Sequence, residues 1–187
     1  MINLAKVFIN PGHDILHDSG AVNIDGTREC DIALEVGKKV EAYLHAAGCE
    51  TMLMQSDNLN WDSNYEDRQD AAVCPTANDW PADLFVSIHC NAANTAARGT
   101  EVEIYRAGGA SELLAHCIQD QIVNALGTID RGVKEMPQLI VLKRTDMPAV
   151  LVELAFIDND EDCELLKNNT DDFAAAVARG VTDYLCA

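Results

Sequence analysis

Three short apolar runs in this chain each end in a side chain capable of chemistry, and no other feature restricts the fold as strongly. The runs lead to His13, His89 and Glu153, and each has strand-forming composition: Ala5–Asn10, Leu84–His89 and Ala149–Glu153. Between them, apolar residues recur at helical spacing, as from Glu29 to Ala47. This alternation predicts an α/β domain, in which functional side chains gather at the carboxyl ends of the strands.

The remaining segments extend the same pattern over a chain whose length suits one domain, residues 1–187. Further strands are expected at Thr51–Gln55, Thr100–Tyr105 and Leu139–Lys143. Further helices are expected at 64–73, where Pro75 would interrupt the helix, at 111–126, and from an N-cap near Thr170. Together these elements predict one mostly parallel or mixed sheet flanked by helices.

Charge and composition exclude several classes of partner. The net charge of −18, from 31 acidic and 13 basic residues, opposes binding to nucleic acid and to anionic membranes. No apolar run approaches the ~18 residues that a membrane span needs. The seven cysteines contain no CxxC pair, so we expect reduced thiols. The first residues lack the features of a secretory signal, which leaves two cases open: no classical export signal, or a sequence that begins after one.

The side chains that end the strands point to a metal site. Alone, His13 could hydrogen-bond its loop and His89 could be a satisfied core histidine, but at neighbouring strand ends they favour metal ligation. Glu153 leaves an apolar strand, and burying an unpaired carboxylate costs several kcal/mol, so we expect an acid/base or metal-binding role. The sequence has no HExxH, GxSxG or P-loop motif, and Leu16 breaks the HxxE pattern after His13.

Five segments, in order along nearly the whole chain, resemble one enzyme family. They are Phe8–His13, Arg28–Leu34, Leu84–Ala93, Asp130–Lys134 and Pro148–Asn159. They are similar to segments of the zinc-dependent N-acetylmuramoyl-L-alanine amidases, the type 3 amidase group. This resemblance implies a roughly six-stranded α/β sheet with helices on both faces. It also implies hydrolysis of the amide between N-acetylmuramic acid and L-alanine in peptidoglycan, with no nucleic acid or membrane span involved.

The resemblance also assigns roles to individual residues. It implies one zinc ion held by His13, Glu29 and His89, and a catalytic Glu153. From the sequence alone, Glu29 is more simply a favourable partner of a helix dipole. Two histidines and one carboxylate leave a position for water, as catalytic zinc sites do. Candidate substrate-binding residues are Asn91, Arg131 and Lys134. Two alternatives are open for Arg131 and Lys134: contact with carboxylates of the stem peptide, or a surface role unrelated to substrate.

The loop after His13 departs from the family pattern. The usual Gly-Gly is absent, and the following Asp and Gly are displaced by about one residue, to Asp18 and Gly20. His17 takes the place of the aspartate, as either a loop histidine or a neighbour of the metal ligands. These departures concern substrate selection more than metal binding. His45 and His116 fall within predicted helices and are interpreted as structural or exposed.

Two alternative functions remain open at this point. The first is a catalytically silent wall-binding module on the same fold, and the second is a zinc hydrolase of another small amide or peptide. For the amidase, we expect a monomer that acts on the bacterial cell wall and is cytoplasmic until release, unless a signal has been trimmed. The sequence does not distinguish a host enzyme from a phage enzyme, or one wall chemotype from another.

Overall fold

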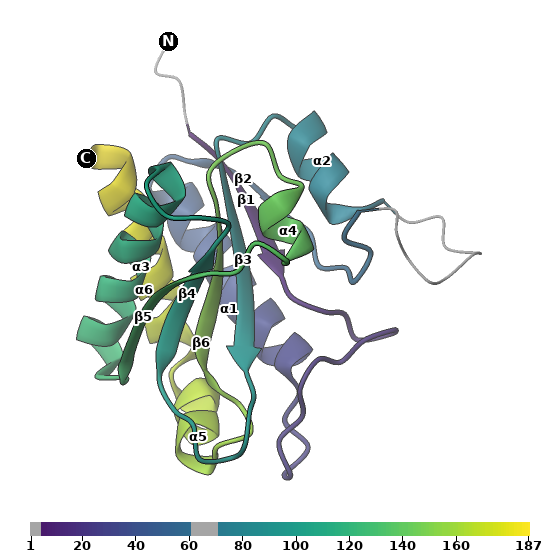
Figure 1. The fold of residues 1–187 in the computed structure, drawn as a ribbon, viewed down its shortest axis with the longest axis vertical. Coiled ribbons are helices and arrows are strands. Elements are labelled where there is room, and N and C mark those ends of the chain that lie inside the picture. The colour runs from purple at the N-terminus through teal and green to yellow at the C-terminus, as the bar shows by residue number, and fades with distance from the viewer. Residues whose placement is uncertain (1–4, 61–70) are drawn as a thin grey trace.

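Six strands form one mixed sheet in the order β2-β1-β3-β6-β4-β5 (Figure 1). The computed structural model describes residues 5–60 and 71–187. Strands β1, β2, β3 and β6 run parallel, β4 is antiparallel to β6, and β5 is parallel to β4. The strands are β1 (Lys6–Pro11), β2 (Glu50–Leu53), β3 (Leu84–Asn91), β4 (Thr100–Ile104), β5 (Asp130–Glu135) and β6 (Ala149–Phe156).

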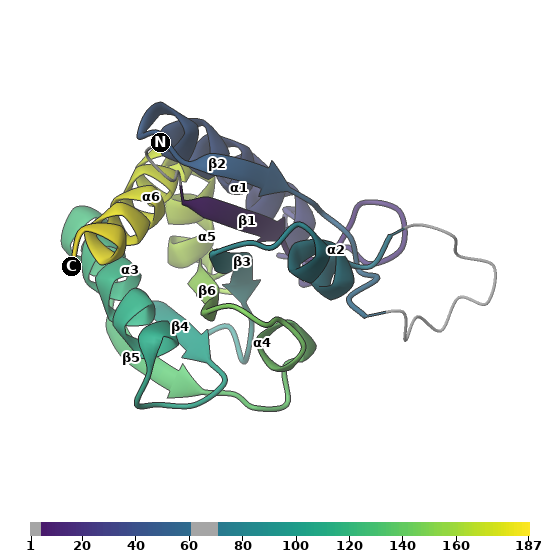
Figure 2. The ribbon, with the colours of Figure 1, turned by 90° about the horizontal axis from the view of Figure 1, so that it is seen from above.

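Helices lie on both faces of this sheet, as expected (Figures 1 and 2). Helices α1 (Glu29–Ala46), α3 (Ala110–Leu126) and α6 (Thr170–Cys186) cover one face and enclose the larger hydrophobic core. The short helices α2 (Val73–Asp79) and α4 (Ile140–Lys143) lie on the other face over a smaller core. Helix α5 (Asp160–Asn168) follows β6 at the carboxyl end of the sheet.

Side-chain alternation along β6 places Glu153 on the face with the smaller core. Val150, Val152 and Leu154 belong to the larger core, whereas Leu151 belongs to the smaller one. Because successive strand residues point to opposite faces, Glu153 shares the face of Leu151. His89 is the direct neighbour of Glu153 in the pairing of β3 with β6. The predicted base and one predicted ligand therefore lie side by side on adjacent strands.

The prediction of a strand at Leu139–Lys143 is wrong, because this segment contains α4. Its apolar side chains Val141 and Leu142 are buried in the smaller core, which a single helical turn achieves as well as a strand. The edge strand beside β4 is instead β5. Its sequence, Asp-Arg-Gly-Val-Lys-Glu, has little of the composition typical of strands. An edge strand pairs on one side only and needs no continuous apolar run, so tertiary pairing overrides its weak propensity.

The segment around Pro75 also differs from its prediction. Most of the helix expected at 64–73 lies outside the described residues, and α2 begins only at Val73. Pro75 lies in the first turn of α2 rather than ending a helix, because the amides of a first turn have no partner within the helix. Thr170 is the first residue of α6, one position after its N-cap Asn169. The other predicted helices and strands are confirmed with small shifts of their ends.

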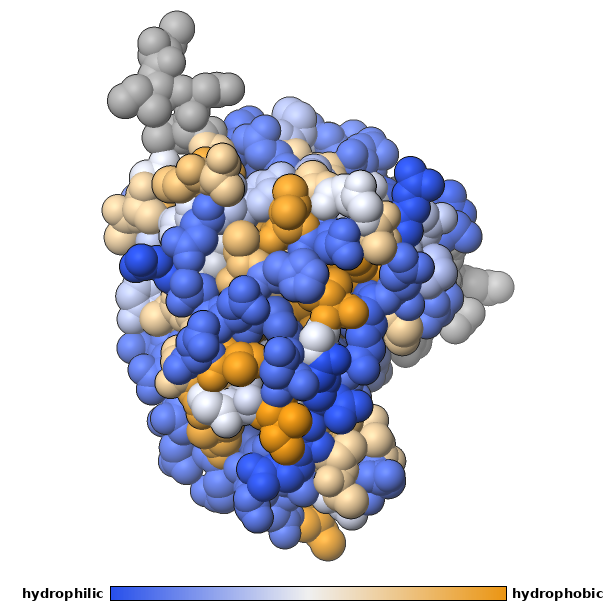
Figure 3. All heavy atoms as spheres, turned by 60° about the vertical axis from the view of Figure 1, so that its left-hand side comes forward, coloured by the Kyte–Doolittle hydropathy of each residue, from blue (hydrophilic) through white to orange (hydrophobic). Residues whose placement is uncertain are grey.

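The surface is predominantly polar. On the face shown in Figure 3, hydrophilic residues separate several small hydrophobic patches. All seven cysteines carry free thiols, and most of them are buried. No helix within residues 5–60 and 71–187 has the length and apolar character required to cross a membrane.

Candidate metal centre

Three predicted metal ligands converge at the carboxyl ends of β1 and β3. His13 follows β1, Glu29 is the first residue of α1, and His89 lies near the end of β3. The Oε1 atom of Glu29 is 3.2 Å from Nε2 of His13 and 2.9 Å from Nδ1 of His89. One ligand atom from each residue lies within 4.8 Å of the others. Residues from three distant parts of the chain thus face one point.

Two glycines make this close approach possible. A Cβ atom at Gly12 would overlap the ring of His89, and one at Gly20 would lie 2.6 Å from both Glu29 Oε2 and His13 Cδ2. Gly20 also has a φ of +66°, a left-handed conformation that favours glycine. His13 itself has a φ of 60°, which costs a non-glycine residue about 1 kcal/mol or more. The backbone therefore tolerates strain where it aims this imidazole at Glu29.

Glu29 is the electrostatic centre of the cluster. Its side chain is buried, and it accepts hydrogen bonds from the amides of Ala21 at 2.9 Å and Cys90 at 3.1 Å. Burial alone would raise its pKa, but contacts with His13 and His89 outweigh burial and hold the pKa well below its usual range. Glu29 is therefore an ionised acceptor fixed in place by four neighbours.

Asp18 fixes the orientation of the His13 ring. Its Oδ2 atom lies 2.7 Å from Nδ1 of His13, while Nε2 faces Glu29. Because a carboxylate only accepts, the proton belongs on Nδ1 and Nε2 is left as the ligand atom. Burial would lower the pKa of His13, but Glu29 and Asp18 raise it to about 9. A cation must therefore displace a proton from this imidazole when it binds.

The structure thus gives Asp18 the role considered for His17. His17 instead lies with its Nδ1 atom 3.2 Å from Oδ2 of Asp14. Together with Asp57, these two residues form a second group of potential ligands in the neighbouring loops. The only sequence signal for Asp18 was that the family's aspartate is displaced by about one position in this chain. Of the other histidines, His45 and His116 are exposed on helices.

The donor set fits a catalytic zinc ion. Two imidazole nitrogens and one carboxylate oxygen are typical protein ligands of such sites, which keep a further position for water or substrate. Glu29 contributes a negative charge to the donor set. The contact of His13 with Asp18 resembles the carboxylate–histidine pairs in which the carboxylate orients a zinc ligand.

Replacing Asp18 with alanine should weaken zinc binding about 10- to 100-fold, the usual effect of losing an outer carboxylate. The ring of His13 would lose the partner that selects its Nε2 atom as a ligand. Competition with a chromogenic chelator measures this affinity. Asp25→Ala is a matched control, since Asp25 lies in the same loop region but pairs with Lys167. Equal affinities of the Asp18 variant and the control would contradict this role.

Glu153 lies beside the cluster without a polar partner of its own. Part of the side chain is exposed, but among the described residues its buried Oε2 atom has no hydrogen bond. Burial, followed by the charges of Glu29, Glu103 and Glu101, raises the pKa of Glu153 well above its usual value. A carboxyl with a raised pKa next to three candidate metal ligands is suited to accept and release protons.

The three predicted substrate-binding residues all contact one carboxylate, that of Glu101 on β4. Asn91 donates to its Oε1 atom at 2.8 Å, and Arg131 donates to its Oε2 atom at 2.7 Å. The Nζ atom of Lys134 lies 3.3 Å from the same Oε2 atom. Glu101 has no distinctive signal in the sequence, because the alternating segment Thr-Glu-Val-Glu-Ile resembles an ordinary half-exposed strand.

Glu103, two residues further along β4, should make stability depend on pH. Burial and the charge of Glu101 raise its pKa from 4.5 to about 7, although Lys134 acts in the opposite direction. Below pH 4.5 both the folded and unfolded states hold the proton, and between 4.5 and about 7 only the folded state does. The unfolding free energy therefore falls as pH rises through this window, by at most roughly 3 kcal/mol.

Replacing Glu103 with glutamine should remove this loss. In urea unfolding of metal-free protein, we expect the variant to gain roughly 1–3 kcal/mol relative to the original chain between pH 4.5 and pH 8. Glu50→Gln is the control, because Glu50 is exposed on the edge strand β2. A difference between Glu103→Gln and the original chain that stays constant with pH would refute the prediction.

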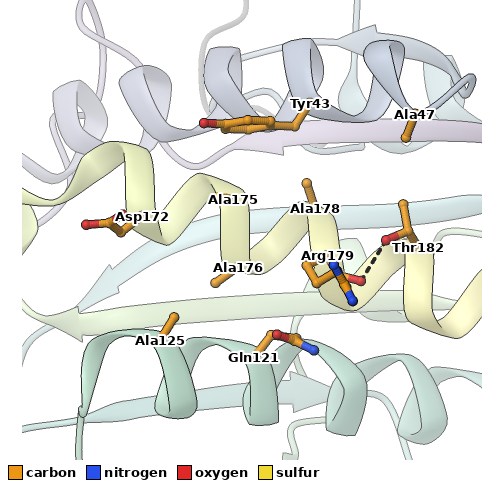
Figure 4. Close-up of a pocket in the computed structure, with 10 residues that line it drawn as sticks. All are labelled: Tyr43, Ala47, Gln121, Ala125, Asp172, Ala175, Ala176, Ala178, Arg179 and Thr182. Atoms are coloured by element: carbon orange, nitrogen blue, oxygen red, sulfur yellow. Dashed lines mark hydrogen bonds between the residues drawn. The ribbon is translucent and has the colours of Figure 1, made fainter.

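A separate groove lies over the helices that cover the larger core (Figure 4). It runs along α6 between α1 and α3, and it is lined largely by alanine and polar side chains. Its residues are Tyr43, Ala47, Gln121, Ala125, Asp172, Ala175, Ala176, Ala178, Arg179 and Thr182. The predicted ligands and Glu153 are not among them, so the groove is separate from the candidate active site.

Comparison with known sequences agrees with the geometry. A family model described as N-acetylmuramoyl-L-alanine amidase matches residues 7–183. The N-acetylmuramoyl-L-alanine amidase LytC of Bacillus subtilis (strain 168) is 37% identical over 184 residues, which are 95% of this chain and 35% of LytC. The uncharacterized protein YqiI of the same organism is also 37% identical, over 95% of this chain and 84% of YqiI. The chain thus spans about a third of LytC and most of YqiI.

Solved structures show the same fold. The catalytic domain of CwlV, an N-acetylmuramoyl-L-alanine amidase from Bacillus (Paenibacillus) polymyxa var. colistinus, superposes with a TM-score of 0.83 at 32% identity, covering 98% of this chain and 99% of that one. The amidase AmiC2 of Nostoc punctiforme also has a TM-score of 0.83, at 29% identity and with 98% of each chain covered. With its sequence matched almost end to end, this chain belongs to the N-acetylmuramoyl-L-alanine amidase family.

Proposed function

We propose that this chain is a zinc-dependent peptidoglycan hydrolase that cleaves the amide between N-acetylmuramic acid and L-alanine. The observation that carries the proposal is the convergence of His13, Glu29 and His89 beside the unpartnered carboxyl of Glu153. Relatives named for this activity, such as LytC and CwlV, support it. One zinc ion accounts for the three donors, and the substrate is peptidoglycan or a soluble muropeptide.

Each residue of the candidate site would have its own role in hydrolysis. His13, Glu29 and His89 would hold the ion, with Asp18 keeping the ring of His13 in the ligand orientation. When bound, zinc supplies a Lewis acid that polarises the scissile carbonyl and lowers the pKa of water. Glu153 takes a proton from the attacking water and delivers it to the nitrogen of the leaving L-alanine. Its apolar neighbours Val152 and Leu154 are fully buried on the opposite face and hold the strand in place.

The surroundings of Glu153 suit this proton transfer. Burial and three carboxylates favour its protonated form, so Glu153 would hold the proton taken from water until it passes to the leaving nitrogen. A divalent cation held by His13, Glu29 and His89 would favour the ionised form of Glu153 that takes up the proton. A general base needs both influences, because it must be ionised before it takes a proton and protonated before it gives one up.

The same proposal includes substrate contacts and a place of action. Asn91, Arg131 and Lys134 would contact the stem peptide near Glu153, and the chain would act on the cell wall as a monomer. A partner is known for one structural neighbour, the CwlD amidase from Clostridioides difficile, whose structure is a complex with the GerS lipoprotein.

Product analysis on defined muropeptides tests the function. Zinc-loaded protein should release the intact stem peptide with a free L-alanine amino group, which mass spectrometry identifies. Wall binding without any product would support a silent binding module instead. Cleavage within the peptide, or of an unrelated acylated amine alone, would support a hydrolase of another amide. Removing zinc with a chelator should abolish product formation, and adding zinc back should restore it.

A further inference from the structure

Glu101 on β4 lies between the candidate catalytic residue Glu153 on β6 and the basic residues Arg131 and Lys134 on β5. In the antiparallel pairing of β4 with β6, Glu101 lies directly opposite Glu153. Lys134 on β5 lies opposite Glu103, which shares a sheet face with Glu101 because it is two residues away on the same strand. Glu101, Glu153 and Lys134 therefore lie on one face of the sheet, across three adjacent strands.

The side chain of Glu101 is only 8% exposed, and both of its oxygens are occupied. Asn91 donates to Oε1, while Arg131 and Lys134 share Oε2 at 2.7 Å and 3.3 Å. A buried carboxylate with two basic partners holds them in one geometry. Without its charge, the two cations would repel each other at this short range.

The ion pairs of Glu101 differ from the others among the described residues. Among ion pairs of the described residues, Glu101 is the one carboxylate that contacts two Lys or Arg side chains. The other Lys and Arg ion pairs of these residues join one cation to one acid, as in Arg28 with Asp31, or one cation to two acids, as in Lys167 with Asp25 and Glu164. In a protein with a net charge of −18, two basic side chains held on one carboxylate beside the candidate active site mark a place where an anion can bind.

The two basic side chains retain hydrogen-bond donors for such an anion. A guanidinium has five N–H donors, of which Arg131 directs one to Glu101 and one to the carbonyl of Arg98. Its Cζ atom stacks 4.8 Å from the ring centre of Phe156, which restricts the plane of the group. The side chains of Arg131 and Lys134 are 32% and 39% exposed, so both reach solvent.

We propose that Glu101 is a positioning residue that presents Arg131 and Lys134 to a carboxylate of the stem peptide. This inference rests on the proposed amidase function and names the chemistry that its substrate must carry. The carboxylate has two possible sources in a stem peptide: the α-carboxyl of the second residue, and the carboxyl at the peptide's end. Arg131 binds either group through two parallel N–H bonds, and Lys134 adds a second charge.

Four matched substrates distinguish the two sources. They are N-acetylmuramoyl tripeptides of L-alanine, γ-linked D-glutamate and L-lysine, with the α-carboxyl of the glutamate free or amidated and the terminal carboxyl free or amidated. For the zinc-loaded original chain, amidating the recognised carboxyl should lower kcat/KM at least about tenfold, mainly by raising KM. Amidating the other carboxyl should have little effect.

The variants Glu101→Gln, Arg131→Met and Lys134→Met then test the positioning role. Each should reduce the discrimination between the carboxylate and the amide substrate to about threefold or less, with unchanged zinc content. Lys143→Met on α4 is the matched control, because Lys143 is exposed and lies outside this cluster. If Glu101→Gln does not fold, Arg131→Met and Lys134→Met still test the positioning role, because both side chains are partly exposed.

The outcomes separate this inference from the proposed function. If all four substrates are cleaved at the same rate by the original chain, or if Glu101→Gln slows all four equally, the positioning role is overturned while the amidase function stands. If none is cleaved between muramic acid and L-alanine, the proposed function fails and this inference fails with it.

Discussion

Glu153→Gln is expected to lower kcat on a defined muropeptide by about 10²–10⁴-fold while leaving the zinc content unchanged. Glutamine has nearly the same shape as glutamate but cannot accept a proton from water. The ligand atoms belong to other residues, so the metal site should persist. Product release followed by mass spectrometry, together with metal analysis of the same sample, measures both quantities.

The substitution should not reduce stability. In the metal-free protein, Glu153 has a buried oxygen without a hydrogen bond and three acidic neighbours, so a neutral side chain removes an unfavourable charge. Urea unfolding at pH 8 should give a free energy at least equal to that of the original chain. Full activity of Glu153→Gln would show that the proton acceptor is another group. Loss of zinc from this variant would show that Glu153 supports the metal rather than the chemistry.

His89→Ala should remove zinc at stoichiometric levels and reduce amidase activity to background. The substitution deletes a ligand nitrogen and also removes a contact that holds Glu29 ionised, at 2.9 Å. The effect should therefore exceed the ~10–100-fold loss expected when an outer partner such as Asp18 is removed. Metal analysis after dialysis against a weak chelator, and activity with added zinc, provide the measurement.

His116→Ala is the matched control for this variant. His116 is exposed on α3, so its removal changes the histidine count without touching the candidate site. It should keep both zinc and activity. A His89→Ala protein that retains one zinc ion per chain would contradict the ligand set, and one that loses zinc but retains turnover would contradict the role of the metal.

Most of the fold could be predicted because it follows local patterns. Strong apolar runs and helical spacing predicted β1, α1, β3, α3 and β6 with small end shifts. The errors lie where local pattern and tertiary context disagree. The strand-like Leu139–Lys143 becomes α4 because one helical turn buries Val141 and Leu142, and the polar Asp130–Glu135 becomes β5 because β4 offers it a partner.

The candidate site also contains some residues that could be recognised from the sequence and others that could not. The strand ends carrying His13, His89 and Glu153 were recognisable from the residues alone, because polar groups that close buried runs require an explanation. Glu29 required the resemblance to a family, since a glutamate at a helix start has a simpler interpretation. Glu101 could not be recognised at all, because its significance lies in partners on other strands and in the adjoining loop.

The sequence by itself determined the α/β class and which strands end in candidate metal-binding and acid/base side chains, because both follow from periodicity and residue chemistry within short segments. Only the tertiary structure decided which aspartate supports His13, which strand closes the sheet, and that Asn91, Arg131 and Lys134 meet at Glu101. These outcomes depend on pairing across strands and loops, and the geometry of such contacts is not encoded in any single segment.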